Sequence, residues 1–155
     1  MIIEDTRQQE GKHEHRHGWW RAHGVEFEER SRALPFGDYI REGSNICIDT
    51  KQSLAELSGD VLQQHDRFKR ECERARCAGY RLIILTETSK CTNLDDLEKV
   101  CNVHPQARRV KPLPGKVPAR VCRTMESHHG VRFEFCTRDE SARRICELLG
   151  VDYDD

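Results

Sequence analysis

The most constraining feature of this chain is a short, almost entirely apolar run, RLIILTE, at residues 81–87. A run of this length and composition, shortly after Gly79, is typical of a β-strand that is buried on both faces. Such a strand needs cover on each side of its sheet, and helices supply that cover in α/β proteins. The run therefore predicts a central sheet layered by helices.

The remaining sequence supplies further strands and helices for such a sheet. Alternating or apolar patterns bounded by turn residues predict strands at residues 1–5, 25–34, 38–40, 45–50 and 131–135. Helically spaced apolar residues predict helices at residues 11–24, 53–76, 94–101, 117–127 and 140–149. The strands at 38–40 and 45–50 flank a turn sequence and are expected to pair as a hairpin. The predicted fold class is α/β, with a central mixed β-sheet flanked by helices.

The length of 155 residues suits one domain with a sizeable core and is too short for two ordinary domains. We therefore expect a single domain over residues 1–150, followed by an acidic tail at residues 151–155. No stretch approaches the roughly 20 apolar residues of a membrane span, and the N-terminus lacks the pattern of a secretory signal. These features predict a cytoplasmic protein without a membrane segment.

The charge is balanced overall but unevenly distributed. The 26 basic and 27 acidic residues give a formal net charge of −1, which excludes a strongly basic nucleic-acid binder in the global sense. Between Glu98 and Glu126, however, the sequence contains no acidic residue and several basic ones. This segment is a candidate for contact with a phosphate backbone, and a solvated loop and helix face is the alternative. The candidate DNA contacts within it are Arg108, Arg109, Lys111 and Lys116.

Eight cysteines raise the alternatives of disulfides and structural zinc. Disulfides are disfavoured in a chain expected to reside in a reducing compartment. The cysteine spacings match no standard zinc motif. Several cysteines instead stand where a small apolar residue would pack, namely Cys47, Cys72, Cys136 and Cys146. Zinc is therefore not expected.

The run HEHRH, at residues 13–17, is a second place where a metal could bind. Its alternation fits neither a helix face nor a regular zinc motif. We expect it to be a solvated polar segment.

The most informative stretch for chemistry surrounds Asp49 and Lys51. Residues two apart in a strand point to the same face, so these two side chains project together. Asp38 lies on the preceding strand of the expected hairpin, and pairing could bring its carboxylate toward Asp49. Two adjacent carboxylates remain ionised readily when a cation lies between them, and Mg²⁺ suits that position because it prefers oxygen ligands. Lys51 could orient a water molecule or neutralise charge that develops on a phosphate. A surface salt bridge is the alternative.

Four motifs in order give the chain a resemblance to a known family. They are Asp5-Thr6-Arg7 after the first strand, Gly37-Asp38-Tyr39, Asp49-Thr50-Lys51 before the long helix, and a buried strand that ends in Glu87. This set resembles the XPF-type nuclease domain of the PD-(D/E)XK superfamily, in particular its short stand-alone versions from phages and bacteria. The motifs cover about residues 1–90, and the similarity is weaker beyond them. The resemblance implies a restriction-endonuclease-like fold.

The resemblance also implies roles for individual residues. Asp38 and Asp49 would be metal ligands, with the backbone carbonyl of Thr50 as a third, and the ion would be Mg²⁺ or Mn²⁺. Lys51 would be the catalytic lysine, with Asp5 at the rim of the same site.

Two groups of residues around this site are assigned more loosely. Arg7 could contact phosphate, and Arg67, Glu71 or His65 on the long helix could face the site. Glu87 is expected to be a strand-end residue.

Some positions depart from the family pattern. The usual Glu-Arg-Lys is Asp-Thr-Lys here, the acid expected four residues after the lysine is Ala55, and the acid that often follows Asp-Thr-Arg is Gln8. The printed sequence also contains no tandem helix-hairpin-helix segment of the kind that eukaryotic and archaeal relatives use to grip branched DNA, so the resemblance does not extend to junction specificity.

The sequence thus supports a leading hypothesis and two alternatives. The leading hypothesis is a metal-dependent DNA endonuclease that hydrolyses phosphodiester bonds in repair, recombination or replication, and the resemblance makes a homodimer an expectation. The first alternative is an inactive nuclease-like subunit that binds DNA or a protein partner. The second, a zinc-binding structural protein, rests on the cysteine and histidine counts.

Overall fold

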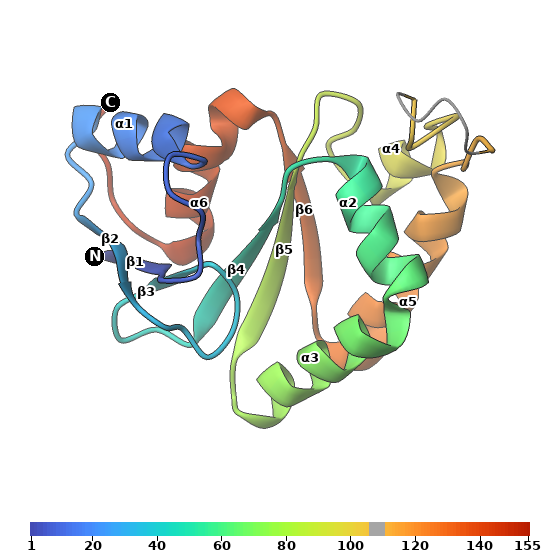
Figure 1. Ribbon diagram of the computed structural model, residues 1–155, viewed down its shortest axis with the longest axis horizontal. Helices are drawn as coiled ribbons and strands as arrows, with labels where there is room; N and C mark the ends of the chain where they lie inside the picture. The colour runs from blue at the N-terminus through green and yellow to red at the C-terminus, as the bar shows by residue number, and fades with distance from the viewer. Residues whose placement is uncertain (106–110) are drawn as a thin grey trace.

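The computed structural model describes residues 1–105 and 111–155, which form one mixed sheet with helices on both faces (Figure 1). The strands follow the spatial order β2-β1-β3-β4-β5-β6. Their bounds are β1 Ile2–Asp5, β2 Phe27–Arg32, β3 Tyr39–Arg41, β4 Ile46–Lys51, β5 Arg81–Glu87 and β6 Arg132–Cys136. The predicted fold class is confirmed.

The pairing of the strands explains the sequence pattern. β3 and β4 form the predicted antiparallel hairpin, and β3 also pairs antiparallel with β1. β4, β5 and β6 run parallel, and β1 runs parallel to β2 at the other edge. β5 lies inside the sheet, and its residues from Leu82 to Glu87 are all buried, as its apolar composition predicted.

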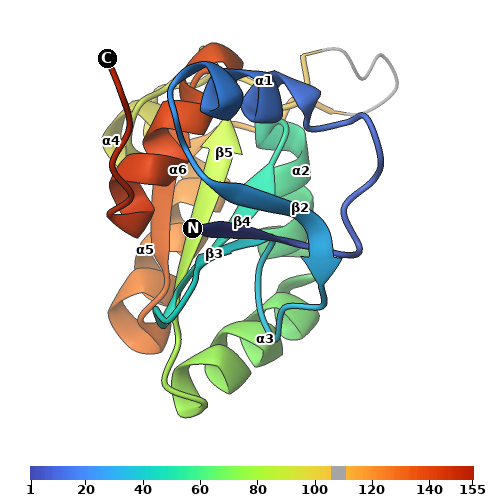
Figure 2. The same ribbon diagram turned by 90° about the vertical axis from the view of Figure 1, so that its left-hand side faces the viewer.

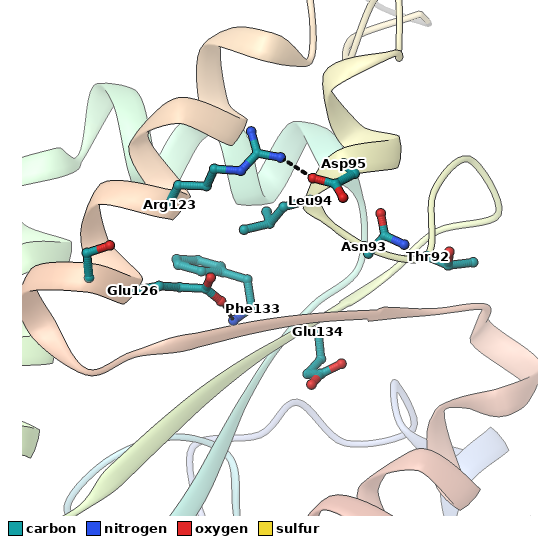
Figure 3. A pocket seen from close by; sticks show the side chains of 9 residues that line it. Thr92, Asn93, Leu94, Asp95, Arg123, Glu126, Phe133 and Glu134 are labelled. Atoms are coloured by element: carbon teal, nitrogen blue, oxygen red, sulfur yellow. Dashed lines mark hydrogen bonds and ion pairs between the residues drawn. The ribbon is translucent and has the colours of Figure 1, made fainter.

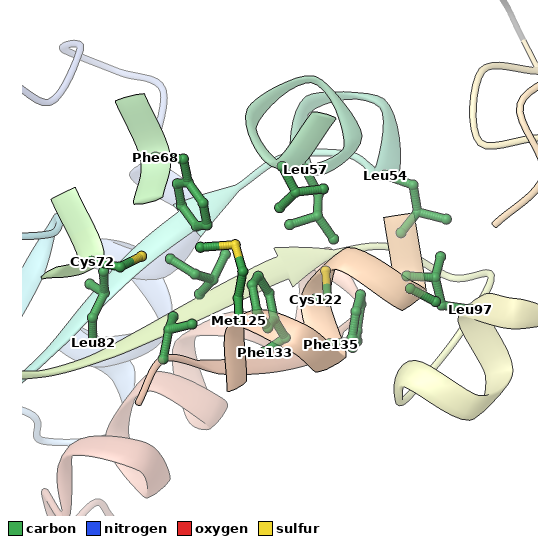
Figure 4. Packing of buried hydrophobic residues seen from close by; sticks show 14 of the residues in the cluster. Leu54, Leu57, Phe68, Cys72, Leu82, Leu97, Cys122, Met125, Phe133 and Phe135 are labelled. Carbon is green, nitrogen blue, oxygen red and sulfur yellow. The ribbon is translucent and has the colours of Figure 1, made fainter. Parts of the chain in front are cut away.

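Two helical layers cover the sheet (Figures 1 and 2). The helices are α1 Glu14–Ala22, α2 Leu54–Ser58, α3 His65–Cys77, α4 Leu94–Glu98, α5 Lys116–His129 and α6 Ser141–Leu149, with a short 3₁₀ turn at Arg138–Glu140. One core cluster joins α2, α3, α4 and α5 to the sheet, and Figure 4 shows Phe68, Met125 and Phe133 packed within it. A second cluster joins α1 and α6 to the opposite face through Trp20, Ile145 and their neighbours.

The segment predicted as one helix at residues 53–76 is divided. A π-helical turn, η1 Gly59–Gln63, separates α2 from α3. Within it the Gln64 backbone N–H donates to the Gly59 carbonyl at 2.9 Å, five residues back instead of four. The apolar stripe of Leu57, Val61 and Phe68 still faces the core across this turn. Apolar spacing therefore identified the buried face but not the change of helix type.

The prediction for the HEHRH run is wrong. His13 precedes α1, and the residues from 14 to 17 form its first turn. His13, Arg16 and His17 are 5%, 0% and 3% exposed, so the run is largely buried instead of solvated. Positions three and four apart share one face of a helix, and this face lies against polar side chains of the sheet that accept hydrogen bonds from it.

The prediction that Cys47, Cys72, Cys136 and Cys146 pack as small apolar residues is confirmed, because all four are buried. In the part of the chain that the structure describes, no helix has both the length and the apolar composition needed to cross a bilayer.

Candidate active site

A polar pocket of about 250 Å³ lies where the loop after β1 faces the end of β4. Residues from both segments line it, together with the residue that precedes β3. The lining residues are Arg7, Gln8, Gln9, Lys12, His13, Asp38, Asp49, Thr50, Lys51, Gln52 and Glu56. The structure thus brings together Asp38, Asp49, Thr50 and Lys51, which the sequence had placed in one site.

Strand geometry places Asp49 and Lys51 side by side. Both lie on β4, and Lys51 Nζ is 3.1 Å from Asp49 Oδ2. The ammonium of Lys51 also contacts the carboxylate of Asp60, which lies in the π-helical turn. Lys51 is 9% exposed, so its charge is held by two carboxylates in a place with little water.

The position of Asp38 depends on a close approach between two backbones. Gly37 has a φ of 71°, and a Cβ at this position would lie 2.8 Å from the Ile48 carbonyl oxygen. The Asp38 backbone N–H donates to that same oxygen at 2.7 Å. Glycine is therefore required before Asp38 both for its left-handed backbone and for the lack of a side chain.

The Asp38 carboxylate is oriented by three donors. The Thr50 N–H and hydroxyl both donate to Oδ2, at 2.7 and 2.8 Å. The Gln8 amide donates to Oδ1 at 2.5 Å. Thr50 thus fixes the direction of Asp38, a role that the sequence did not indicate.

The electrostatics of this pocket favour a cation. Burial and the nearby Asp38 carboxylate raise the pKa of Asp49 to about 7. Burial and the charge of Asp49 also raise the pKa of Glu71. For Lys51, burial opposes the charged form, but Asp49 and Asp60 outweigh it and raise the pKa. The carboxylates around Lys51 therefore repel one another more than one ammonium compensates, and a divalent cation would relieve that repulsion.

His13 forms part of the pocket wall in its neutral form. Burial and the adjacent Arg16 guanidinium lower the pKa of His13 to about 4. Arg16 Nη1 lies 2.6 Å from His13 Nδ1, which must accept because guanidinium can only donate. The remaining nitrogen, Nε2, then carries the proton.

Other predicted residues have different surroundings. Asp5 is 2% exposed, and its carboxylate accepts from Arg7 Nε at 2.7 Å and from the Leu34 N–H at 2.8 Å. Asp5 is not one of the described residues that line the pocket. Its carboxylate instead orients Arg7, whose side chain is 68% exposed at the rim. Glu87 ends β5, as expected, and pairs with Arg16 at 2.8 Å.

The predicted basic residues are spread over several surfaces. Arg67 is exposed on α3, Lys116 is exposed at the start of α5, and Lys111 is exposed before it. Arg108 and Arg109 lie outside the described residues.

The basic segment between residues 99 and 123 is partly neutralised by acids from an earlier helix. Arg123 on α5 pairs with Asp95 on α4 at 2.5 Å (Figure 3). Arg123 also contacts Glu98 on the same helix as Asp95. Arg123 and Asp95 border a second pocket, of about 510 Å³. Counting charges along the sequence did not anticipate this pairing across α4 and α5.

The sequence interpretation gave no role to Lys12, Glu56 or Asp60. Glu56 follows the position where the family acid was expected, and its carboxylate accepts from the Gln52 N–H at 2.9 Å. Asp60 had no sequence signal, because its contact with Lys51 depends on the π-helical turn.

Comparison with known proteins identifies a similar fold but no sequence relative. No protein-family model and no curated protein matches this sequence. Among solved structures, the chain is similar to XPF from Aeropyrum pernix, with a TM-score of 0.64 and 14% sequence identity. The match covers 97% of this chain and 65% of that one. The chain therefore has an XPF-like fold and spans under two thirds of the length of that structural neighbour.

Proposed function

We propose that this protein is a divalent-metal-dependent DNA endonuclease that hydrolyses phosphodiester bonds at the pocket of Asp38, Asp49 and Lys51. The observation that carries the proposal is the pair of neighbouring carboxylates, one just before β3 and one on β4 of the same hairpin, with a buried lysine beside the second. The XPF-like fold supports it. So does the pocket lining, because residues from three of the four motifs that carry the family resemblance line it, namely Arg7, Asp38 and Asp49-Thr50-Lys51.

The residues present fit a hard divalent cation. Asp38 and Asp49 offer carboxylate oxygens, and the Thr50 carbonyl is the proposed third protein ligand. Oxygen ligands of this kind suit Mg²⁺ or Mn²⁺. When bound, such an ion supplies Lewis acidity toward a phosphate oxygen and lowers the pKa of bound water.

The side chains of the pocket have separate tasks in the proposed reaction. Lys51 would neutralise negative charge that develops on the phosphate during attack, and Asp49 and Asp60 hold its ammonium in place. Arg7 and Lys12, both exposed at the pocket, would bind flanking phosphates of the DNA. Asp5 positions Arg7 through its hydrogen bond.

The remaining proposed DNA contacts are Arg67, Lys111 and Lys116, together with Arg108 and Arg109. We further propose a role in repair, recombination or replication of phage or bacterial DNA. The homodimer expected from the family remains a proposal, and so does the cytoplasmic location.

The test is cleavage of branched, single-stranded and duplex DNA in the presence of Mg²⁺ or Mn²⁺. We expect Asp49→Asn and Lys51→Ala to reduce the cleavage rate by at least about 100-fold, because each removes a group that stabilises the transition state. Exposed residues of the same types, Asp66→Asn and Lys90→Ala, are the matched controls and should cleave as the wild type does. Equal rates in the site variants and the wild type would refute the site assignment.

One observation favours a second function, an inactive nuclease-like subunit that binds DNA or a protein partner. The Gln8 amide donates to the Asp38 carboxylate from a position where an acid often stands in relatives. Titration calorimetry with Mg²⁺ separates the two functions. Heat of binding that disappears in Asp49→Asn supports the nuclease, whereas no measurable binding to the wild type supports the inactive subunit.

A further inference from the structure

Two glutamates and a buried histidine converge on the sheet face that carries α1, and none of the three lines the proposed nuclease pocket. Glu14 and His17 lie one turn apart on α1, and Glu29 lies on the edge strand β2. One donor atom from each of the three side chains lies within 4.8 Å of the other two. We propose that Glu14, His17 and Glu29 bind a divalent transition-metal cation, with Zn²⁺ as the best match.

The histidine points at the two carboxylates without a hydrogen bond to either. His17 is 3% exposed, and its Nδ1 has no hydrogen-bond partner among the described residues. Nδ1 lies 3.5 Å from Glu14 Oε2 and 3.3 Å from Glu29 Oε1. The edge of a tetrahedron around zinc, with ligand bonds of about 2.1 Å, is about 3.4 Å. The two distances therefore match the spacing of neighbouring ligands around one ion.

The other nitrogen of the same ring is held by a buried carboxylate. His17 Nε2 is 2.7 Å from Glu4 Oε2, and the Tyr39 hydroxyl donates to the same oxygen at 2.7 Å. With an ion bound, a proton on Nε2 that is donated to Glu4 would leave the lone pair on Nδ1 for the ion between Glu14 and Glu29. Carboxylate–histidine–metal arrangements of this kind orient the imidazole in protein metal sites. Glu4 would fill this supporting role.

On the exposed side of the cluster, Arg21 holds both glutamates in place. Arg21 Nη1 pairs with Glu14 Oε1 at 2.7 Å, and Arg21 Nη2 lies 3.9 Å from Glu29 Oε2. The guanidinium thus contacts the outer oxygen of each carboxylate, and the inner oxygens, Glu14 Oε2 and Glu29 Oε1, remain directed at His17. Because the three ligands leave a coordination position toward solvent, water would complete the shell.

The ligand set separates this site from the nuclease pocket. An imidazole nitrogen favours Zn²⁺ or Co²⁺ over Mg²⁺, whereas the pocket of Asp38 and Asp49 offers oxygen ligands only. The two sites should therefore differ in metal preference. An ion at the α1 site would tie α1 to the edge strand β2, which gives it a structural role.

The experiment measures Zn²⁺ binding by titration calorimetry in an Asp49→Asn background, which weakens binding at the nuclease pocket. Exposed thiols are removed by Cys77→Ser and Cys101→Ser, because thiolates also bind zinc. We expect one Zn²⁺ per chain and a rise in melting temperature of several degrees at saturation. Glu14→Gln or Glu29→Gln should weaken binding at least tenfold. The matched control is Glu26→Gln, an exposed glutamate three residues before Glu29, which should bind as the parent does.

Two further measurements keep the result interpretable. Co²⁺ in place of Zn²⁺ should give visible ligand-field bands without thiolate charge-transfer bands, and Glu29→Gln should abolish them. Since Glu14 and Glu29 are exposed, their variants should fold, and circular dichroism checks this. No zinc binding by the parent protein, or unchanged affinity in both glutamine variants, would overturn the proposal. Because the Asp49→Asn background is used throughout, neither result depends on nuclease activity.

Discussion

At the scale of single residues, the two-residue period of a strand determines the geometry of the charged pair in the pocket. Asp49 and Lys51 had to share a face because they are two apart in β4, and the structure places their charged atoms 3.1 Å apart. The contact of Asp60 with Lys51 was not predictable, because it depends on a helix turn that apolar spacing does not encode. The same holds for Thr50, whose hydroxyl and N–H hold Asp38.

The raised pKa of Asp49 predicts a pH dependence of stability in the metal-free protein. Its pKa is about 7 in the fold against an ordinary value of 3.8, so between these values the folded chain holds a proton that the unfolded chain has lost. The contribution of Asp49 to stability should therefore fall as the pH rises from about 4 to about 7. Asp49→Asn removes this loss, and its melting temperature relative to wild type should be a few degrees higher at pH 8 than at pH 5.

The measurement is thermal unfolding with a chelator present, repeated with Mg²⁺. Asp38 and Lys51 flank position 49 in both proteins, so the comparison reports the ionisation of Asp49 together with its coupling to these two neighbours. Added Mg²⁺ should stabilise the wild type more than the variant at pH 8. A melting-temperature difference that does not change with pH would show that Asp49 is ionised throughout.

At the scale of elements, the sequence predicted the β3–β4 hairpin. It did not predict the close backbone contact that places Asp38 beside β4. Turn residues and alternation located both strands. The sequence did not show that Gly37 must lie against the Ile48 carbonyl, because this approach exists only after the strands pair. Likewise, the HEHRH run lies inside the segment 11–24 that the sequence predicts as a helix, but only the packed structure shows that β1, β3 and β5 supply its polar partners.

Two glycines in this region provide a matched test of that close approach. Gly37 and Gly43 both have positive φ values, of 71° and 79°, but a Cβ at Gly43 would meet nothing within 4 Å. Gly43→Ala should cost about 1 kcal/mol, from backbone strain alone. Gly37→Ala adds a clash with the Ile48 carbonyl and should cost about 1–3 kcal/mol more. Chemical denaturation measures both, and equal losses would show that the hairpin relaxes without strain.

At the scale of the whole molecule, a buried polar network connects elements from both halves of the sheet. The Arg16 guanidinium donates to Glu87 on β5 at 2.8 Å, to Tyr39 on β3 at 3.1 Å and to Ser141 on α6 at 3.2 Å. Arg16 itself is fully buried. Charged groups inside a protein are retained only when paired, so this network links α1 to the sheet and to α6.

Removal of Arg16 should destabilise the protein strongly. Arg16→Met leaves the Glu87 carboxylate buried without its main partner, and we expect a loss of about 3–5 kcal/mol. The double variant Arg16→Met/Glu87→Gln should recover part of this loss, because the unpaired charge is then absent. Arg143→Met, on the exposed face of α6, is the control and should change stability by less than about 0.5 kcal/mol. A loss of similar size in the control would contradict the role of the network.

The position of β1 between β2 and β3 has a consequence for the order of folding. The β3–β4 hairpin closes a short loop, whereas β1 pairs with partners about 25 and 37 residues away in the chain. Local contacts form faster than distant ones, so the hairpin that carries Asp38 and Asp49 should form before β1 joins the sheet. The segment after β1, with Arg7, Gln8 and Lys12, would then pack against Asp38 and Asp49 after the hairpin has already placed these two carboxylates side by side. Pulsed hydrogen exchange during refolding should show protection in β4 before protection in β1.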